Sequence, residues 1–425
     1  MQRWARRALS GAAVVGIAGA LLTVGAAGSP PAPPVAPAPA MSEIALLQAD
    51  LERVPGNARG WAALGAAYLQ ESRVTADPSF YAKAEGAFDE ALALEPSSDV
   101  ALAGAAALAA ARHDFAGALV LTDRALHENP YNAPALAVRA DALTELGRYD
   151  EALDVLREMA DVRPGVDVST RASYAFELRG DVDRARAALD EAVEIATLPA
   201  DVAFAHHYLG EIAFASGDLD GARRSYDAAA AADPSYLPAV AGRAKVLAAT
   251  GDATAALAEL RGVVERLPLP EFLIAYGELL EASGQVEQAQ EQYAVVRATQ
   301  ALFAANGQDV DTELALFEAD HGTPAAAVAA ASKAYELRPR SVVTQDAYAW
   351  ALHKAGRSAE ALPVARDALR LGWRNPAMLA RVGTIEAAAG DPAAARRLLS
   401  EALALNPVFS PLHAPRAAAL LESLR

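Results

Sequence analysis

The sequence predicts an all-α solenoid of about ten stacked helix pairs, with a single helix capping each end. Two registers of small residues, each repeating about every 34 positions, lead to this prediction. The first register consists of alanines: Ala84, Ala118, Ala152, Ala185, Ala222, Ala256, Ala289, Ala327, Ala361 and Ala395. The second consists of glycines five residues before most of those alanines: Gly147, Gly180, Gly217, Gly251, Gly284, Gly322, Gly356 and Gly390. A fixed period of this length is typical of repeated units that stack.

Each position in the period has a physical role in one helix pair. Apolar residues at helical spacing, such as Val240, Ala244 and Leu247, predict the first helix of a pair. The glycine ends that helix, because it adopts a left-handed turn at little steric cost. The aspartate that often follows, as in Gly217-Asp218, can cap the second helix. The alanine lets the two helices approach closely, and a proline near the end stops the second helix.

One unit carries a pattern that resembles a known repeat family. Trp61-x-x-Leu64-Gly65-x-x-Tyr68, followed by Ala84-x-x-x-Phe88 and Pro96, is similar to the tetratricopeptide repeat. The resemblance implies a right-handed superhelical solenoid over residues 41–425. Its ten repeats are expected at 58–96, 99–130, 133–164, 166–197, 203–234, 237–268, 270–301, 308–339, 342–373 and 376–407.

Three places depart from the regular period. Extra residues stand at 72–78 between the helices of the first unit, and at the joints near 197–199 and 306–307. We expect these insertions to form loops. Residues 41–54 predict an amphipathic N-terminal capping helix, and residues 408–425 a C-terminal cap that covers the last apolar face.

Composition excludes several classes of partner and chemistry. The chain has a net charge of −17 and no cysteine. An acidic surface disfavours nucleic acid and anionic lipid as partners. The absence of cysteine excludes disulfides, thiolate metal sites and cysteine nucleophiles.

The N-terminal segment predicts export. Residues 1–7 are basic, residues 8–28 are uncharged and mostly apolar, and residues 29–40 form a linker rich in proline and alanine. This order is that of a secretory signal peptide. Residues 8–28 are also long enough to span a bilayer, so an uncleaved membrane anchor is the alternative. Either possibility places the solenoid outside the cytoplasmic membrane.

No motif in the sequence indicates an enzyme, a metal site or a cofactor. No two of the seven histidines have the His-x-x-x-His spacing of a metal-binding pair, and no phosphate-binding glycine loop or nucleophile elbow occurs. Any catalysis would have to come from residues on the solenoid itself, such as the face of Asp346, Trp350 and His353.

The resemblance implies a binding site on the concave face. In tetratricopeptide-repeat proteins the first helices of successive pairs line a groove that binds extended peptides. Carried over to this chain, the groove positions with polar or aromatic side chains are Tyr174, Glu177, His207, Glu211, Glu278, Glu281, Asp346, Trp350 and His353. They predict an open, acidic groove for a neutral-to-basic segment. The alternative for Tyr174 and Trp350 is packing between neighbouring repeats.

The function predicted from these observations is a non-enzymatic, extracytoplasmic scaffold that binds a partner protein or peptide and needs no cofactor. The alternative is a structural component of the cell envelope that assembles by self-association. Capping helices disfavour that alternative, because they hide the apolar face that a neighbouring copy would need.

Overall fold

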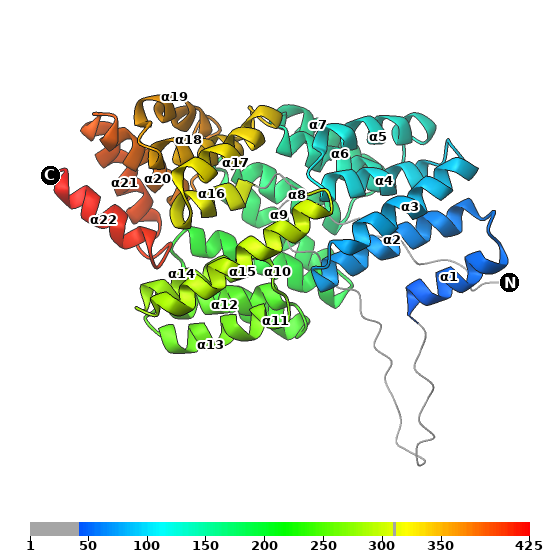
Figure 1. Cartoon of the computed structure of the whole chain (residues 1–425), viewed down its shortest axis with the longest axis horizontal. Helices are drawn as coiled ribbons and strands as arrows, with labels where there is room; N and C mark the ends of the chain where they lie inside the picture. Colours follow the sequence, from blue (N-terminus) through cyan, green and yellow to red (C-terminus); the bar gives the residue numbers. More distant parts are fainter. Residues whose placement is uncertain (1–41, 309–311) are drawn as a thin grey trace, which may run out of the picture.

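The computed structural model describes residues 42–308 and 312–425, which form 22 α-helices and no strand (Figure 1). Ten consecutive helix pairs lie between two terminal helices, α1 (Glu43–Arg53) and α22 (His413–Ser423). The first helices of the pairs are α2 (Ala58–Thr75), α4 (Asp99–Ala111), α6 (Ala133–Glu145), α8 (Val166–Glu177), α10 (Pro199–Ala215), α12 (Leu237–Ala249), α14 (Pro270–Ala282), α16 (Thr312–His321), α18 (Val342–Lys354) and α20 (Pro376–Ala388). The second helices are α3 (Ser79–Leu94), α5 (Phe115–Glu128), α7 (Tyr149–Val162), α9 (Val182–Ile195), α11 (Leu219–Ala232), α13 (Ala253–Val264), α15 (Val286–Ala305), α17 (Pro324–Leu337), α19 (Ser358–Ala368) and α21 (Pro392–Leu405).

This architecture confirms the predicted all-α solenoid of helix pairs with a cap at each end. The expected export segment (1–28) and the linker (29–40) lead into α1, but both lie outside the described residues.

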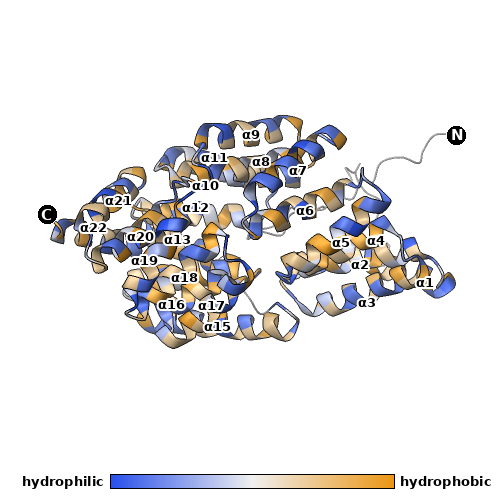
Figure 2. Ribbon diagram, turned by 90° about the horizontal axis from the view of Figure 1, so that it is seen from above, coloured by the Kyte–Doolittle hydropathy of each residue, from blue (hydrophilic) through white to orange (hydrophobic). Residues whose placement is uncertain are grey.

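The alanine register forms the contact between the two helices of each pair. Its ten alanines are at most 1% exposed. Large rings fill the space beside small residues: a Cβ on Gly65 would lie 2.6 Å from the ring of Phe88, and one on Gly210 would lie 2.5 Å from the ring of Tyr226. Figure 2 shows hydrophobic and hydrophilic residues alternating along the helices, as expected when each helix buries one face.

The turns between paired helices follow the predicted chemistry, with two differences. Gly217 has a φ of 78°, and the Asp218 side chain accepts a hydrogen bond of 2.8 Å from the Gly221 amide. In the second pair His113 takes the glycine's place, with a φ of 62°. The expectation of a left-handed turn at Gly322 is wrong, because this glycine does not have a positive φ and Thr323 caps α17 directly after it.

The extra residues are divided between helices and the loops expected from the sequence. Residues 76–78, 197–198 and 306–307 lie outside the helices, as expected, whereas the helices beside them are longer than those of other units. α2 continues to Thr75, α10 begins at Pro199, and α15 extends to Ala305, past the expected end of its repeat at 301. Added helical residues satisfy their own backbone hydrogen bonds, whereas a loop would leave those groups to solvent.

The superhelix returns onto itself after five pairs. The turn at Gly147 in the third pair meets the backbone of Arg340 at the end of the eighth. The same contact joins Gly180 to Gly372, in the fourth and ninth pairs. The turn at Gly217 in the fifth pair likewise meets Leu405 at the end of the tenth. Figure 1 shows the result, with the end of α17 close to the start of α7 although nine helices lie between them in sequence.

Hydrogen bonds join the two coils at the same places. The Val342 amide donates to the Tyr149 hydroxyl at 2.8 Å, and the Asn406 side chain donates to the Phe214 carbonyl at 2.7 Å. These partners are 193 and 192 residues apart. One turn of the superhelix therefore spans between five and six units of the repeat.

We predict that glycine turns at the coil contact tolerate a side chain less well than equivalent turns elsewhere. Gly180 and Gly356 have φ values of 71° and 77°. A Cβ on Gly180 would lie 2.4 Å from the Gly372 carbonyl oxygen, whereas one on Gly356 would meet nothing within 4 Å. Gly356→Ala should cost about 1–2 kcal/mol from the left-handed backbone alone. Gly180→Ala should cost about 1–3 kcal/mol more, because the coils must separate. Urea denaturation of the two variants measures the difference, and equal losses would contradict the coil contact.

Candidate functional site

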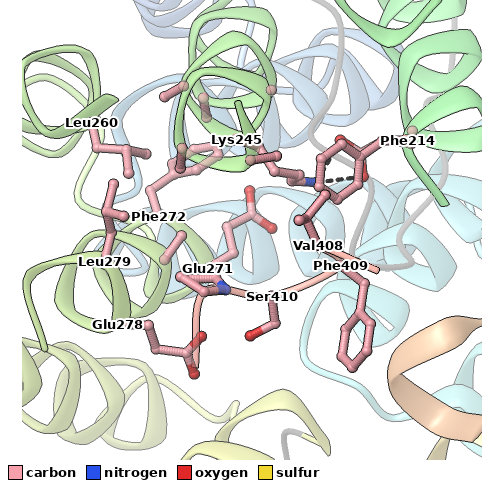
Figure 3. A pocket seen from close by; sticks show the side chains of 18 of the residues that line it. Phe214, Lys245, Leu260, Glu271, Phe272, Glu278, Leu279, Val408, Phe409 and Ser410 are labelled. Atoms are coloured by element: carbon pink, nitrogen blue, oxygen red, sulfur yellow. Dashed lines mark hydrogen bonds and ion pairs between the residues drawn. The ribbon is translucent and has the colours of Figure 1, made fainter. Parts of the chain in front are cut away.

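A cavity of about 470 Å³ lies on the inner face of the fifth, sixth and seventh pairs. Its floor comes from α10, α12 and α14, which contribute Phe214, Phe272 and Leu279 among others. The opposite wall is the chain segment 407–415, which runs from the end of α21 into the first turn of α22 and includes Val408 and Phe409 (Figure 3). A cavity with a mostly apolar lining and a few polar groups is typical of a binding site.

An ion pair between neighbouring units forms the polar group on one side of the floor. Lys245 on α12 binds both carboxylate oxygens of Glu211 on α10, at 2.8 and 2.7 Å. The Tyr226 hydroxyl donates to the same carboxylate at 2.6 Å. Burial alone would raise the pKa of Glu211, but Lys245, His207 and these hydrogen bonds lower it to about 2. Glu211 is therefore ionised and already paired.

His207 borders the cavity beside this pair and is neutral. Its ring lies against the rings of Tyr208, Tyr226 and Tyr236. Burial lowers the pKa of His207 to about 4, against the opposing effect of Glu211. Its Nδ1 atom is enclosed without a hydrogen-bond partner among the described residues.

The other side of the floor carries a network of carboxylates and histidines. The two ring nitrogens of His321 on α16 lie 3.2 Å from a Glu278 oxygen and 3.5 Å from a Glu281 oxygen. His413 on α22 lies 3.7 Å from Glu278, and Arg416 lies 3.7 Å from Glu281. Burial raises the pKa of Glu278, but the two histidines outweigh it and lower the pKa to about 2. The expectation of two open carboxylates is wrong here, because both are paired and partly buried.

Tyr174 and Glu177 lie at the contact between coils. The Trp373 indole of the ninth pair donates to Glu177 at 3.2 Å, and Tyr174 packs in the same cluster as Trp373 and Leu371. Burial raises the pKa of Glu177 to about 7, against the hydrogen bond from Trp373, and the nearby Glu211 charge adds to the rise.

Asp346, Trp350 and His353 are packed between units. Asp346 is 3% exposed and forms an ion pair with Arg381 of the next unit. Trp350 is 7% exposed, and its indole donates to Asp320 at 3.1 Å. The expectation that these two residues line an open groove is therefore wrong, since neighbouring units cover them. His353 lies on the same helix, where its ring nitrogen is 3.0 Å from the Ser358 hydroxyl.

The structure thus brings together His207, Glu211 and Glu278 around one cavity, with Glu281 beside it, and leaves the other predicted residues elsewhere. Sequence reasoning missed the bases that pair with the acids. Asp141–Arg171, Glu211–Lys245, Asp320–Lys354 and Asp346–Arg381 each join an acid to a base 30 to 35 positions later. An acid followed by a base one repeat later is the signal that could have revealed these pairs.

The described residues hold neither a metal-binding cluster nor a membrane-spanning helix. No group of three or more His, Cys, Asp or Glu side chains in this part of the chain could hold a metal ion. Within residues 42–308 and 312–425, no helix is both long and apolar enough to cross a membrane.

Comparison with known families agrees with the helix-pair geometry. Two family models described as tetratricopeptide repeat match the chain, one at residues 109–173 and 213–272 and the other at 179–237. The chain is a tetratricopeptide-repeat (TPR) protein. No curated protein matches this TPR protein in sequence.

Several solved structures are similar to the TPR protein at low identity. One is the APC/C hetero-tetramer Cut9-Hcn1, with 14% identity, coverage of 91% of this chain and 97% of that chain, and a TM-score of 0.41. A second is a thermophilic TPR protein of Thermus thermophilus, with 22% identity, coverage of 45% and 99%, and a TM-score of 0.40. A third is a TPR protein of Parabacteroides merdae, with 17% identity, coverage of 57% and 97%, and a TM-score of 0.42.

We predict that the pKa of Glu177 makes stability depend on pH. Because its pKa is about 7 in the folded chain against 4.5 ordinarily, the folded chain retains a proton that the unfolded chain releases as pH rises from 4.5 to 7. Stability therefore falls across that range. Glu177→Gln removes the effect and keeps an acceptor for Trp373. The variant should be more stable than wild type by about 1–3 kcal/mol at pH 8 and should match it at pH 4.

Urea denaturation at the two pH values provides the measurement. The control is Glu194→Gln at an exposed position on α9, which should leave the pH dependence as in wild type. A Glu177→Gln advantage that is the same at pH 4 and pH 8 would contradict the raised pKa.

Proposed function

We propose that this TPR protein is a non-enzymatic, extracytoplasmic scaffold that binds an extended segment of a partner protein on the inner face of α10, α12 and α14. TPR folds serve protein–protein interaction. The cavity on that face is the observation that carries the proposal, because it exposes apolar side chains beside fixed charges. All 22 helices of the described residues belong to the repeats or their caps, so a separate catalytic domain has no place among them.

The charges around the cavity favour a neutral-to-basic partner segment. Three carboxylates line it, from Glu211, Glu271 and Glu278, against the single ammonium group of Lys245. His207 adds no charge at neutral pH, because its pKa is about 4. An excess of negative charge steers basic segments to the site and disfavours acidic ones.

The proposal is restricted to this part of the solenoid because polar side chains at other inner positions bind other units of the chain. Glu177 binds Trp373 across the coil contact, and Asp346 binds Arg381 in the next unit. A partner could reach those side chains only by breaking contacts that hold the superhelix together.

The location outside the cytoplasmic membrane is proposed from the N-terminal sequence. Its support is the order of a basic start, an apolar middle and a segment rich in small residues over positions 1–28, followed by the linker at 29–40. Those residues act either as a cleaved signal peptide or as an anchor of the solenoid in the membrane.

We predict that a bulky cation on the cavity floor abolishes partner binding. Ala275 on α14 is exposed and lines the cavity, so Ala275→Arg fills the site without removing a core contact. The control is Ala393→Arg at an exposed position on α21. Affinity capture from extract of the source cells should retain a partner on wild type and on the control, and lose it on Ala275→Arg. Equal retention by all three proteins would contradict the site, and capture of only this protein itself would favour the self-assembly alternative.

We predict that protein isolated from its source cells is found outside the cytoplasm. Protease added to intact spheroplasts should digest the solenoid, and mass spectrometry of the N-terminal peptide should show a start near residue 29 if the segment is cleaved. A full-length N-terminus in the membrane fraction indicates the anchor. Full-length protein protected inside the cytoplasm would contradict the proposed location.

A further inference from the structure

The wall of the cavity opposite α10, α12 and α14 is a segment of the chain itself. Pro407, Val408, Phe409, Ser410 and Pro411 line the cavity from this side, together with Ala414 and Pro415 at the start of α22. We call residues 407–415 the strap. In Figure 3 the strap crosses the cavity, with Val408 beside Phe214 and Ser410 near Glu271 and Glu278.

The strap is attached firmly at its beginning. The side chain of Asn406, which is fully buried, donates to the Phe214 carbonyl at 2.7 Å. Just before it, the Leu405 carbonyl packs against the turn at Gly217. This end of the strap coincides with the contact between the two coils.

At the other end Leu412 and Ala414 are buried and Phe409 packs against the apolar cluster of the last units, but the polar contacts are long. His413 lies 3.7 Å from Glu278 and 3.6 Å from Asp320, and Arg416 lies 3.7 Å from Glu281. These distances exceed a hydrogen bond, so the contacts are weaker than the direct hydrogen bond at Asn406.

Several backbone amides of the strap bond to groups at its own beginning and centre. The Val408 amide donates to the Asn406 side chain, and the amides of Leu412 and His413 donate to the Ser410 hydroxyl. Pro407, Pro411 and Pro415 have no amide hydrogen to satisfy. The strap can therefore leave the floor without depriving those backbone amides of their hydrogen-bond partners.

The volume of the cavity leaves too little space beside the strap for an extended partner segment, so the two compete for the same floor. A segment of nine extended residues is about 30 Å long, and a cavity of about 470 Å³ is of the size that encloses one small ligand. A partner segment can lie along α10, α12 and α14 only where the strap now lies.

We propose that the strap is a displaceable internal occupant of the partner site, and that the partner segment has the same side-chain chemistry. This inference rests on the proposed function. The partner segment carries prolines around a branched apolar residue, which packs beside Phe214 as Val408 does in the strap. A basic residue near its end then meets Glu278 and Glu281, as His413 and Arg416 do in the strap and at the start of α22.

The strap is part of the same chain as the floor, and this attachment explains why the strap stays on the floor when no partner is present. α22 packs on α20 and α21 through Ala417, Leu420 and Leu421, so it holds the strap close to the floor. A tethered segment has an effective concentration in the millimolar range, which a free segment must exceed through its own affinity. Partner binding therefore strengthens when the strap is loosened.

The test uses a fluorescent peptide with the sequence of residues 405–416 and the full-length protein. The loosened variant Val408→Ser/His413→Gln removes the apolar contact beside Phe214 and the imidazole facing Glu278. Its matched control is Val120→Ser/His127→Gln, in which the same changes are made at exposed positions on α5. Fluorescence anisotropy should show at least tenfold tighter peptide binding by the loosened variant than by wild type or the control. Adding Ala275→Arg to the loosened variant should abolish that binding.

Equal peptide affinity in wild type and the loosened variant would overturn the proposal, as would tight binding that survives Ala275→Arg. Circular dichroism and gel filtration check that each variant is folded. A measurement on wild type alone provides a second test: saturating peptide should speed amide hydrogen exchange at residues 408–413, and unchanged exchange would overturn the displacement. If Ala275→Arg abolishes partner capture while the peptide fails to bind the loosened variant, the binding site stands and only the strap proposal fails.

Discussion

The contact between successive coils of the superhelix is the constraint on which the rest of this structure depends. At Gly180 the turn of one pair lies so close to the carbonyl group of Gly372 that a single methyl group would not fit. In an open solenoid each unit contacts only its neighbours, and small changes in the rotation between units accumulate along the chain. Here the third, fourth and fifth pairs rest on the eighth, ninth and tenth, so the curvature between them is fixed at both ends.

The inner face shows the consequence of this close packing. Many of its charged side chains stabilise the solenoid and are not free for a partner: Asp141 binds Arg171, and Asp346 binds Arg381, each in the following unit. A buried pair with both members in place is tolerated, whereas loss of one member leaves an uncompensated charge. The main role of these acids is consequently to hold successive units together through ion pairs. Around α10, α12 and α14, by contrast, the inner face opens into a cavity.

The same geometry determines what covers that cavity. Because the end of the tenth pair rests on the turn of the fifth, the chain that follows it must pass over the inner face of the fifth to seventh pairs on its way to α22. Its prolines then meet the apolar floor, and His413 and Arg416 lie near the carboxylates of Glu278 and Glu281. If the partner binds as proposed, its recognition and the closure of the superhelix are coupled through this one segment.

The sequence by itself determined the repeating unit. The alanines at the helix contact, the glycine turns and the aspartate caps depend on residues within one unit, so their pattern predicts the helix pairs and the capped solenoid. It also places His207, Glu211 and Glu278 on first helices, and these three line the cavity. Only the tertiary structure decided which side chains remain accessible. Trp350 and Asp346 are covered by neighbouring units, and Glu278 meets His413 from the far end of the chain. The physical reason is that the contacts between coils join residues about 190 positions apart. They form because a small rotation between successive pairs adds up to one full turn of the superhelix. The residue pattern within one unit does not determine that total rotation.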